Sequence, residues 1–93
     1  MNKVFVEYRI DGEAREDYLQ FMQSMGEGAR FELYEGTDQP NLFVELWSGL
    51  DKEGYLRLKE ERLNEETGPW AKLNGMVSGG KDKVHIWHFQ KVR

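Results

Sequence analysis

The sequence predicts a single α+β domain with the element order strand, helix, strand, strand, helix, strand. Four segments alternate with the period of two that is typical of β-strands, and two longer segments repeat apolar residues at helical spacing. Segments rich in glycine, proline and asparagine separate them. Right-handed crossovers in this order put both helices on one face of a four-stranded antiparallel sheet, with strand order 4-1-3-2.

The first strand is predicted from Val4 to Ile10, where two registers of side chains alternate along the segment. Asp11 follows it and is a residue type that caps helices. The first helix is expected over residues 12–25, because apolar residues recur there every three or four positions while charged residues occupy the other face. The glycines of segment 26–28 are expected to end it.

Two further strands, over residues 30–35 and 42–47, are predicted to form a hairpin around the turn-forming segment 36–41. A second helix is expected over residues 52–66, capped by Ser48 or Asp51, with its run of Lys, Arg and Glu in solvent. Pro69 favours the start of a short helical turn over residues 69–73, and the last strand is predicted over residues 84–92.

The core is expected where one register of each strand meets the two helices. The predicted strand residues of this core are Val4, Val6, Ile10, Phe31, Leu33, Leu42, Val44, Leu46, Val84 and Ile86, and the helix residues are Tyr18, Phe21, Met25, Leu56 and Leu63. The opposite face of the sheet should then hold Phe5, Phe43, Trp47, Trp87 and Phe89, with Tyr34 beside them. Monomers seldom expose so much contiguous apolar surface, so a twofold homodimer that covers this face is expected.

Composition narrows the class of protein. The 93 residues, of which 39% are hydrophobic, suit one domain spanning residues 1–93. A formal net charge of −4 argues against a nucleic-acid partner. No apolar run approaches the ~20 residues that span a bilayer, and no signal-peptide pattern is present, so no membrane association and a cytoplasmic location are expected. The absence of cysteine excludes disulfides and thiolate chemistry.

The sequence resembles the dimeric α+β barrel superfamily of ferredoxin-like domains, which includes antibiotic-biosynthesis-type monooxygenases. The resemblance rests on the element order, the two-faced sheet and an interrupted second helix that carries Pro69 and Trp70. The resemblance implies a dimer whose two sheets enclose a barrel, with a cavity in each subunit between the sheet and the helices or loops. Its haem-degrading members carry an asparagine on the first strand and a histidine on the second helix. Here Glu7 stands mid-strand and residues 51–76 contain no histidine, so neither haem nor another cofactor is expected.

Polar side chains interleave with the aromatic residues of the second face. Glu7, Arg9, Glu45 and His85 are expected beside Trp47 and Trp87. If Glu7 and Glu45 lie close on neighbouring strands, mutual repulsion would raise one carboxyl pKa and create a general acid or base. The favoured interpretation is that these side chains form an ion-pair and hydrogen-bond network that specifies the dimer.

Two further residue types bear on the kind of site. His85 and His88 are three positions apart on a strand and should point to opposite faces, so no metal site is predicted. Trp70 is expected to close one end of a cavity as a structural plug.

The favoured function is therefore a homodimeric binding or interaction module for a small apolar ligand or a protein partner. The alternative is a cofactor-independent, monooxygenase-like enzyme that acts on an aromatic or quinol substrate, with Glu7 or His85 as the proton acceptor and the tryptophans shaping the pocket.

Overall fold

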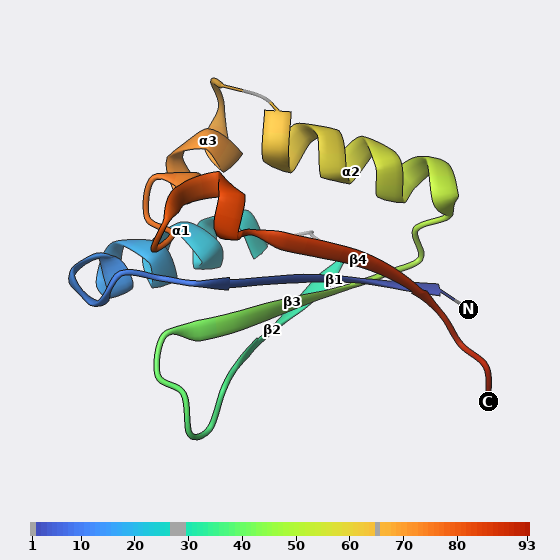
Figure 1. Ribbon diagram of the computed structural model, residues 1–93, viewed down its shortest axis with the longest axis horizontal. Coiled ribbons are helices and arrows are strands. Elements are labelled where there is room, and N and C mark those ends of the chain that lie inside the picture. The colour runs from blue at the N-terminus through green and yellow to red at the C-terminus, as the bar shows by residue number, and fades with distance from the viewer. Residues whose placement is uncertain (1, 27–29, 65) are drawn as a thin grey trace.

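The structure is a computed structural model that describes residues 2–26, 30–64 and 66–93. Its elements follow the predicted order, with a short third helix after the second (Figure 1). The strands and helices are β1 (Asn2–Arg9), α1 (Arg15–Gly26), β2 (Phe31–Glu35), β3 (Leu42–Ser48), α2 (Lys52–Asn64), α3 (Pro69–Asn74) and β4 (His85–Gln90). Two 3₁₀ turns, η1 (Gly12–Ala14) and η2 (Gly80–Lys83), precede α1 and β4.

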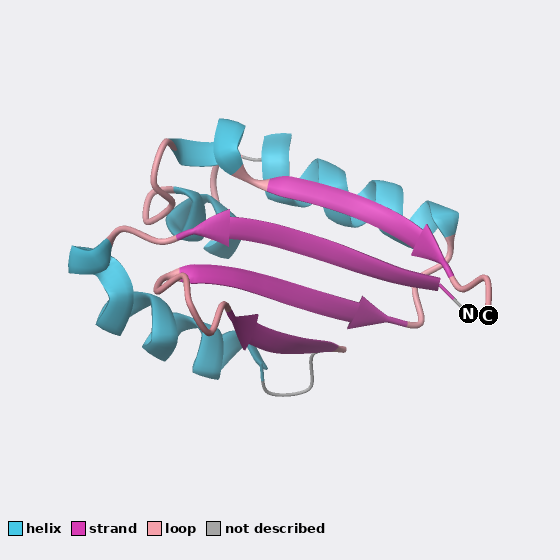
Figure 2. Ribbon diagram, turned by 60° about the horizontal axis from the view of Figure 1, so that its bottom comes forward, coloured by secondary structure: helices cyan, strands magenta, loops and turns pink. Residues whose placement is uncertain are grey.

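The four strands form one antiparallel sheet in the order β2-β3-β1-β4, which confirms the predicted order read from the other edge (Figure 2). Val6 at the centre of β1 lies opposite Glu45 of β3 and Ile86 of β4. All three α-helices lie on one side of the sheet, and no described helix covers the other side (Figure 1). This uncovered side is called the open face below. The chain therefore has a ferredoxin-like α+β fold.

Local signals account for the starts of α2 and α3. Asp51 caps α2, because its Oδ1 accepts a hydrogen bond from the Gly54 backbone nitrogen at 2.8 Å. Pro69 occupies the first turn of α3, as predicted, after Gly68 with a positive φ of 99°. Asp11 makes no side-chain cap, and the first helix begins as the turn η1 before α1. The predicted helix stop at 26–28 falls partly outside the described residues, and α2 is described as far as Asn64, two residues before its predicted end at 66.

The core lies between the sheet and the helices. The inward residues of β1 are at most 1% exposed and pack with Tyr18 and Met22 of α1. In α2, however, the expected core residue Leu56 is 50% exposed, whereas Leu58 and Arg62 are buried. Helical spacing explains the difference, because Tyr55, Leu58 and Arg62 lie three and four positions apart on one face. The expectation that all charged residues of this helix are solvated is wrong for Arg62.

The largest correction concerns β3. Phe43 and Glu45 are buried toward the helices and Trp47 packs against the same core, so the predicted faces of this strand are reversed. Leu42, Val44 and Leu46 consequently lie on the open face. Both registers of β3 are largely apolar, so alternation did not reveal which one faces the helices. Pairing decides it, because Tyr8 and Val6 of β1 face the helices and lie opposite Phe43 and Glu45.

The open face remains rich in apolar side chains despite this reversal. Trp87 and Phe89 are 46% and 51% exposed, and Tyr34 at the other edge is 51% exposed. Phe5 and the three aliphatic residues of β3 fill the centre and are half-buried. Within the described residues, no helix is both long and apolar enough to cross a membrane.

Candidate functional site

A charged network lies buried between the sheet and α2. Arg62 donates from Nη1 to Glu45 Oε1 at 2.6 Å and from Nη2 to Glu45 Oε2 at 2.7 Å. Neither side chain is exposed to solvent. This two-pronged geometry suits the planar guanidinium, and it compensates for the removal of both charges from water.

Glu45 also accepts hydrogen bonds from two aromatic side chains. Trp47 Nε1 donates to Oε1 at 2.8 Å, and Tyr8 donates its hydroxyl hydrogen to Oε2 at 2.5 Å. The hydroxyls of Tyr8 and Tyr18 lie 2.7 Å apart, so Tyr18 extends the network to α1. Each oxygen of the carboxylate thus has two donors, which is all that its lone pairs accommodate in this plane.

Burial keeps the phenols of this network neutral. Burial raises the pKa of Tyr8 far above its ordinary value, and the charge of Glu45 adds to the effect. The pKa of Tyr18 is also raised, again mainly by burial. For Arg62, burial is the largest influence and acts to lower the pKa, but its charge attraction and hydrogen bonds to Glu45 give a net increase. The two phenols therefore stay neutral and Arg62 stays charged near neutral pH.

An aromatic cluster of Trp70, Trp47 and Phe21 lies next to this charged network. The guanidinium of Arg62 lies 3.9 Å from the ring centre of Trp70 on α3, a close cation–π contact. The Trp70 ring in turn contacts Trp47 at 6.4 Å and Phe21 of α1 at 6.1 Å between ring centres. Asn74 anchors α3 to α2 by donating from Nδ2 to the Arg62 carbonyl at 2.7 Å.

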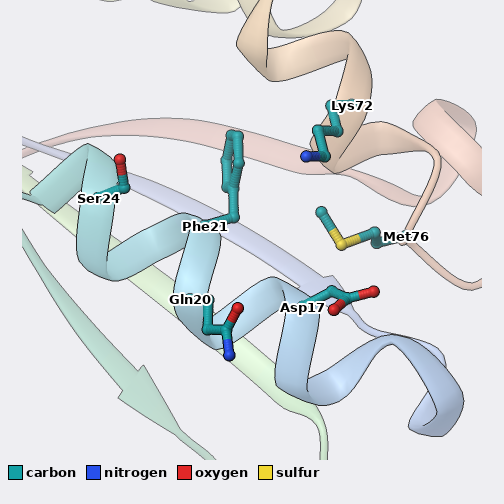
Figure 3. A pocket seen from close by; sticks show the side chains of 6 residues that line it. All are labelled: Asp17, Gln20, Phe21, Ser24, Lys72 and Met76. Carbon is teal, nitrogen blue, oxygen red and sulfur yellow. The ribbon is translucent and has the colours of Figure 1, made fainter.

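A cleft of about 490 Å³ opens between α1 and α3 (Figure 3). Phe21 rises from α1 toward α3, where Met76 and Lys72 face it from the far side. The other lining residues are Asp17, Gln20 and Ser24 of α1, which give the cleft a polar rim. Since Phe21 also contacts Trp70, the apolar wall of the cleft continues into the aromatic cluster and the buried network.

The structure divides the ten residues predicted as ligand-binding or interface candidates between two faces of the sheet. Phe43, Glu45, Trp47 and Trp70 lie on the helix side, where Phe43 packs against Tyr18 at 4.6 Å between ring centres. The others, on β1 and β4, line the open face: Phe5, Glu7, Arg9, His85, Trp87 and Phe89. The predicted proximity of Glu7 and Glu45 is therefore wrong, because their side chains point to opposite faces.

Sequence reasoning missed several residues of the network and of the cleft. Arg62 belongs to the run of charged residues that is expected in solvent, Tyr18 is expected in the core without a polar partner, and no role is predicted for Tyr8. The helical spacing of Arg62 from Tyr55 and Leu58 is a signal that would have indicated its burial. The cleft residues Phe21 and Met76 carried no such signal, because their meeting depends on how α1 and α3 pack.

The histidines behave as predicted. His88 lies on the helix side and stacks on Tyr55 with ring centres 4.7 Å apart, whereas His85 is exposed and stacks on Trp87 at 5.7 Å. Among the described residues, no three His, Asp or Glu side chains come together in a way that would hold a metal ion.

The fold of this chain is similar to that of several solved structures, although the sequence comparisons found no match. No protein-family model matches the sequence, and no curated protein matches it either. A solved structure described as an antibiotic biosynthesis monooxygenase aligns over 100% of both chains with a TM-score of 0.69 and 17% identity. A putative antibiotic biosynthesis monooxygenase from Deinococcus radiodurans aligns over 100% of this chain and 94% of its own, with a TM-score of 0.72 and 13% identity.

A further putative antibiotic biosynthesis monooxygenase, from Nitrosomonas europaea, aligns over 100% of both chains with a TM-score of 0.67 and 13% identity. The chain has the antibiotic-biosynthesis-monooxygenase-like fold. This agrees with the resemblance drawn from the sequence. At these sequence identities the matched structures show a shared fold only. Any function of this chain has to be inferred from its own side chains.

Proposed function

We propose that this protein is a homodimeric binding module that holds a small, largely apolar ligand in the cleft between α1 and α3. The observation that carries the proposal is the saturation of Glu45, whose two oxygens are occupied by Arg62, Tyr8 and Trp47. The carboxylate behind the cleft has no free position with which to take a proton from a ligand. The network instead forms a rigid wall.

The cleft suits a ligand with an apolar body and a polar periphery. Phe21 and Met76 offer apolar contact, and Gln20, Ser24 and Lys72 provide hydrogen-bonding groups at the rim. Pockets that bind small molecules commonly combine these two kinds of lining and have volumes in this range. The Trp70 ring contacts the Phe21 ring, so an occupant that displaces Phe21 would also change the surroundings of Trp70.

The homodimer in this proposal forms through the open face. Trp87, Phe89 and Tyr34 alone expose roughly 100 Å² each, because aromatic side chains offer about 150–250 Å² and these are about half exposed. Burying this area on both copies contributes a hydrophobic free energy of ~15 kcal/mol. This is comparable to the ~4–15 kcal/mol that association costs in lost translational and rotational freedom. The half-buried residues at the centre of the face add to the gain.

A second copy fits this face better than a partner of one charge sign. The open face carries Lys3 at the end of β1 and Glu32 on β2, so a positive and a negative group lie beside the apolar centre. A twofold interface brings such a mixed surface against itself and permits complementary pairs. A groove of about 480 Å³ lined by Phe5 and Phe89 provides room for a side chain of the second copy.

Methionine-methyl NMR tests the ligand proposal, with indole as the apolar probe. We expect indole to shift the Met76 methyl signal saturably and to leave that of Met22, which is buried in the core and does not line the cleft, unchanged. Phe21→Ser should weaken the effect, whereas Leu19→Ser, at an exposed position of the same helix, should not. Equal shifts of both methyls, or no shift of Met76, would contradict the proposal.

The alternative is a cofactor-independent, monooxygenase-like enzyme acting on an aromatic or quinol substrate. Three of the matched structures are named as established or putative antibiotic biosynthesis monooxygenases. The cleft favours this alternative, but Glu7 and His85 lie on the opposite side of the sheet from the cleft. Oxygen uptake with hydroquinone as the probe separates the two functions. We expect none above the rate without protein, and protein-dependent uptake that Phe21→Ser abolishes would favour the enzyme.

A further inference from the structure

A further hollow of about 330 Å³, lined by several polar side chains, lies at the end of the sheet where β1 finishes and β4 begins. Its lining includes Glu7 and Arg9 from β1, His85 from β4, and Ser78 and Lys83 from the loop that precedes β4. It is called the Lys83 hollow here. It is separate from the cleft between α1 and α3, with which it shares no lining residue.

The loop that forms one wall of the Lys83 hollow is held in place by the backbone. Ser78 donates its amide hydrogen to the Arg9 carbonyl at 2.8 Å, next to a β-bridge between Ile10 and Val77. Gly79 has a φ of 87°, and a Cβ there would lie 2.5 Å from Lys83 Cγ. The stem of Lys83 therefore lies against the bare backbone of Gly79, so the hollow is preformed.

The polar groups around the Lys83 hollow are available to a ligand. Within the described part of the chain, the side chains of Glu7, Ser78, Lys83 and His85 make no hydrogen bond or ion pair with another residue, although all line one hollow. The His85 ring is nonetheless oriented, because it stacks on Trp87 with only 8° between the two planes. Arg9 is partly engaged by the turn between β2 and β3, donating to the Pro40 carbonyl at 3.1 Å.

The charges around the hollow select the kind of ligand. Arg9 and Lys83 bring two basic side chains and His85 adds a hydrogen-bond donor, in a chain whose formal net charge is −4. Glu7 is an acceptor only and lies opposite His85 across the β1–β4 pair. An anionic group would therefore sit at Lys83 and His85, while a donor on the same molecule would reach Glu7.

We propose that the Lys83 hollow binds a small carboxylate that also carries a hydroxyl or amino group. Its carboxylate accepts charge-assisted hydrogen bonds from Lys83 and His85, and its hydroxyl or amino group donates to Glu7. Ser78 lines the same space with a hydroxyl that both donates and accepts. This site goes beyond the proposed cleft ligand and does not depend on it.

The two histidines of the chain provide the test. Imidazole NMR signals are followed while glycolate, acetate or inorganic phosphate is added at constant ionic strength. Glycolate should shift the His85 signals saturably and leave those of His88, which lie on the helix side, unchanged. It should also bind more tightly than acetate, because acetate lacks the donor for Glu7, and more tightly than phosphate.

Matched lysine variants complete the experiment. Lys83→Gln should weaken glycolate binding by about tenfold or more, since a hydrogen bond to a charged group is lost. Lys81→Gln removes the same charge from the same 3₁₀ turn at a position that does not line the hollow, and should change binding little. Parallel shifts of both histidines, equal binding of glycolate and acetate, preference for phosphate, or equal effects of the two variants would overturn the proposal.

Discussion

Arg62 of α2 and Glu45 of β3 form a two-pronged ion pair in which neither side chain is exposed to solvent. This pair ties the second helix to the centre of the sheet and explains why β3 turns Glu45 inward. Together with the hydrogen bonds from Tyr8 and Trp47, it occupies both oxygens of this buried carboxylate. The same contact thus stabilises the orientation that pairing with β1 gives to β3.

Removing one partner of this pair should be costly. Glu45→Leu leaves the Arg62 cation buried without its counterion, and we expect a loss of about 3–5 kcal/mol in the free energy of unfolding. The double variant Glu45→Leu/Arg62→Met should lose much less than the sum of the single variants, because no charge stays buried. Guanidinium chloride unfolding at one fixed protein concentration measures these differences. Additive losses would contradict a coupled pair.

The Tyr8 hydroxyl should contribute measurably to stability. Tyr8→Phe deletes the donor to Glu45 and leaves the buried Tyr18 hydroxyl without its Tyr8 partner. We expect a loss of about 1–3 kcal/mol, as is usual when a buried polar group loses its hydrogen bond. Tyr34→Phe makes the same chemical change at a position that is 51% exposed, and should have little effect on urea unfolding. Equal losses in the two variants would argue against the network.

Glu35 should make the fold sensitive to acid. Hydrogen bonds from Arg15, and then from the Asn41 backbone nitrogen, lower the pKa of Glu35 from 4.5 to about 2. A carboxyl with a lowered pKa stabilises the folded state above its unfolded pKa, and this contribution is lost as pH falls from about 4.5 toward 2.

The pH dependence of thermal unfolding measures this contribution. Glu35→Gln should flatten the decline of the melting temperature across that acidic range. Glu32→Gln, at an exposed position of the same strand, removes an equal charge without these hydrogen bonds and should leave the decline in place. A decline that persists unchanged in Glu35→Gln would show that other groups cause it.

The open face should determine the oligomeric state. Trp87→Glu puts a charge at an exposed apolar position of that face, and we expect it to shift a dimer to a monomer in sedimentation velocity while the circular dichroism spectrum is retained. Leu56→Glu introduces the same charge on the outer side of α2, where Leu56 is similarly exposed, and should leave the dimer intact. A wild-type protein that sediments as a monomer at high concentration would contradict the dimer.

Much of the fold was determined by the sequence alone. The alternation of β1 and β4, the turn at 36–41 and the Pro69 helix start are local signals, and each appears in the structure close to its predicted position. The strand order followed from the handedness of the crossovers. These features depend on residues that are near one another along the chain, so the sequence pattern contains them.

Only the tertiary structure decided the face of β3 and the partner of Arg62. Both registers of β3 can be buried, so its orientation depends on the pairs that it makes with β1 and on the cation that α2 brings to Glu45. The cleft between α1 and α3 and the Lys83 hollow likewise arise where segments distant in sequence meet. Periodicity reports which side chains share a face, but the free energy of packing and charge pairing determines which face is buried.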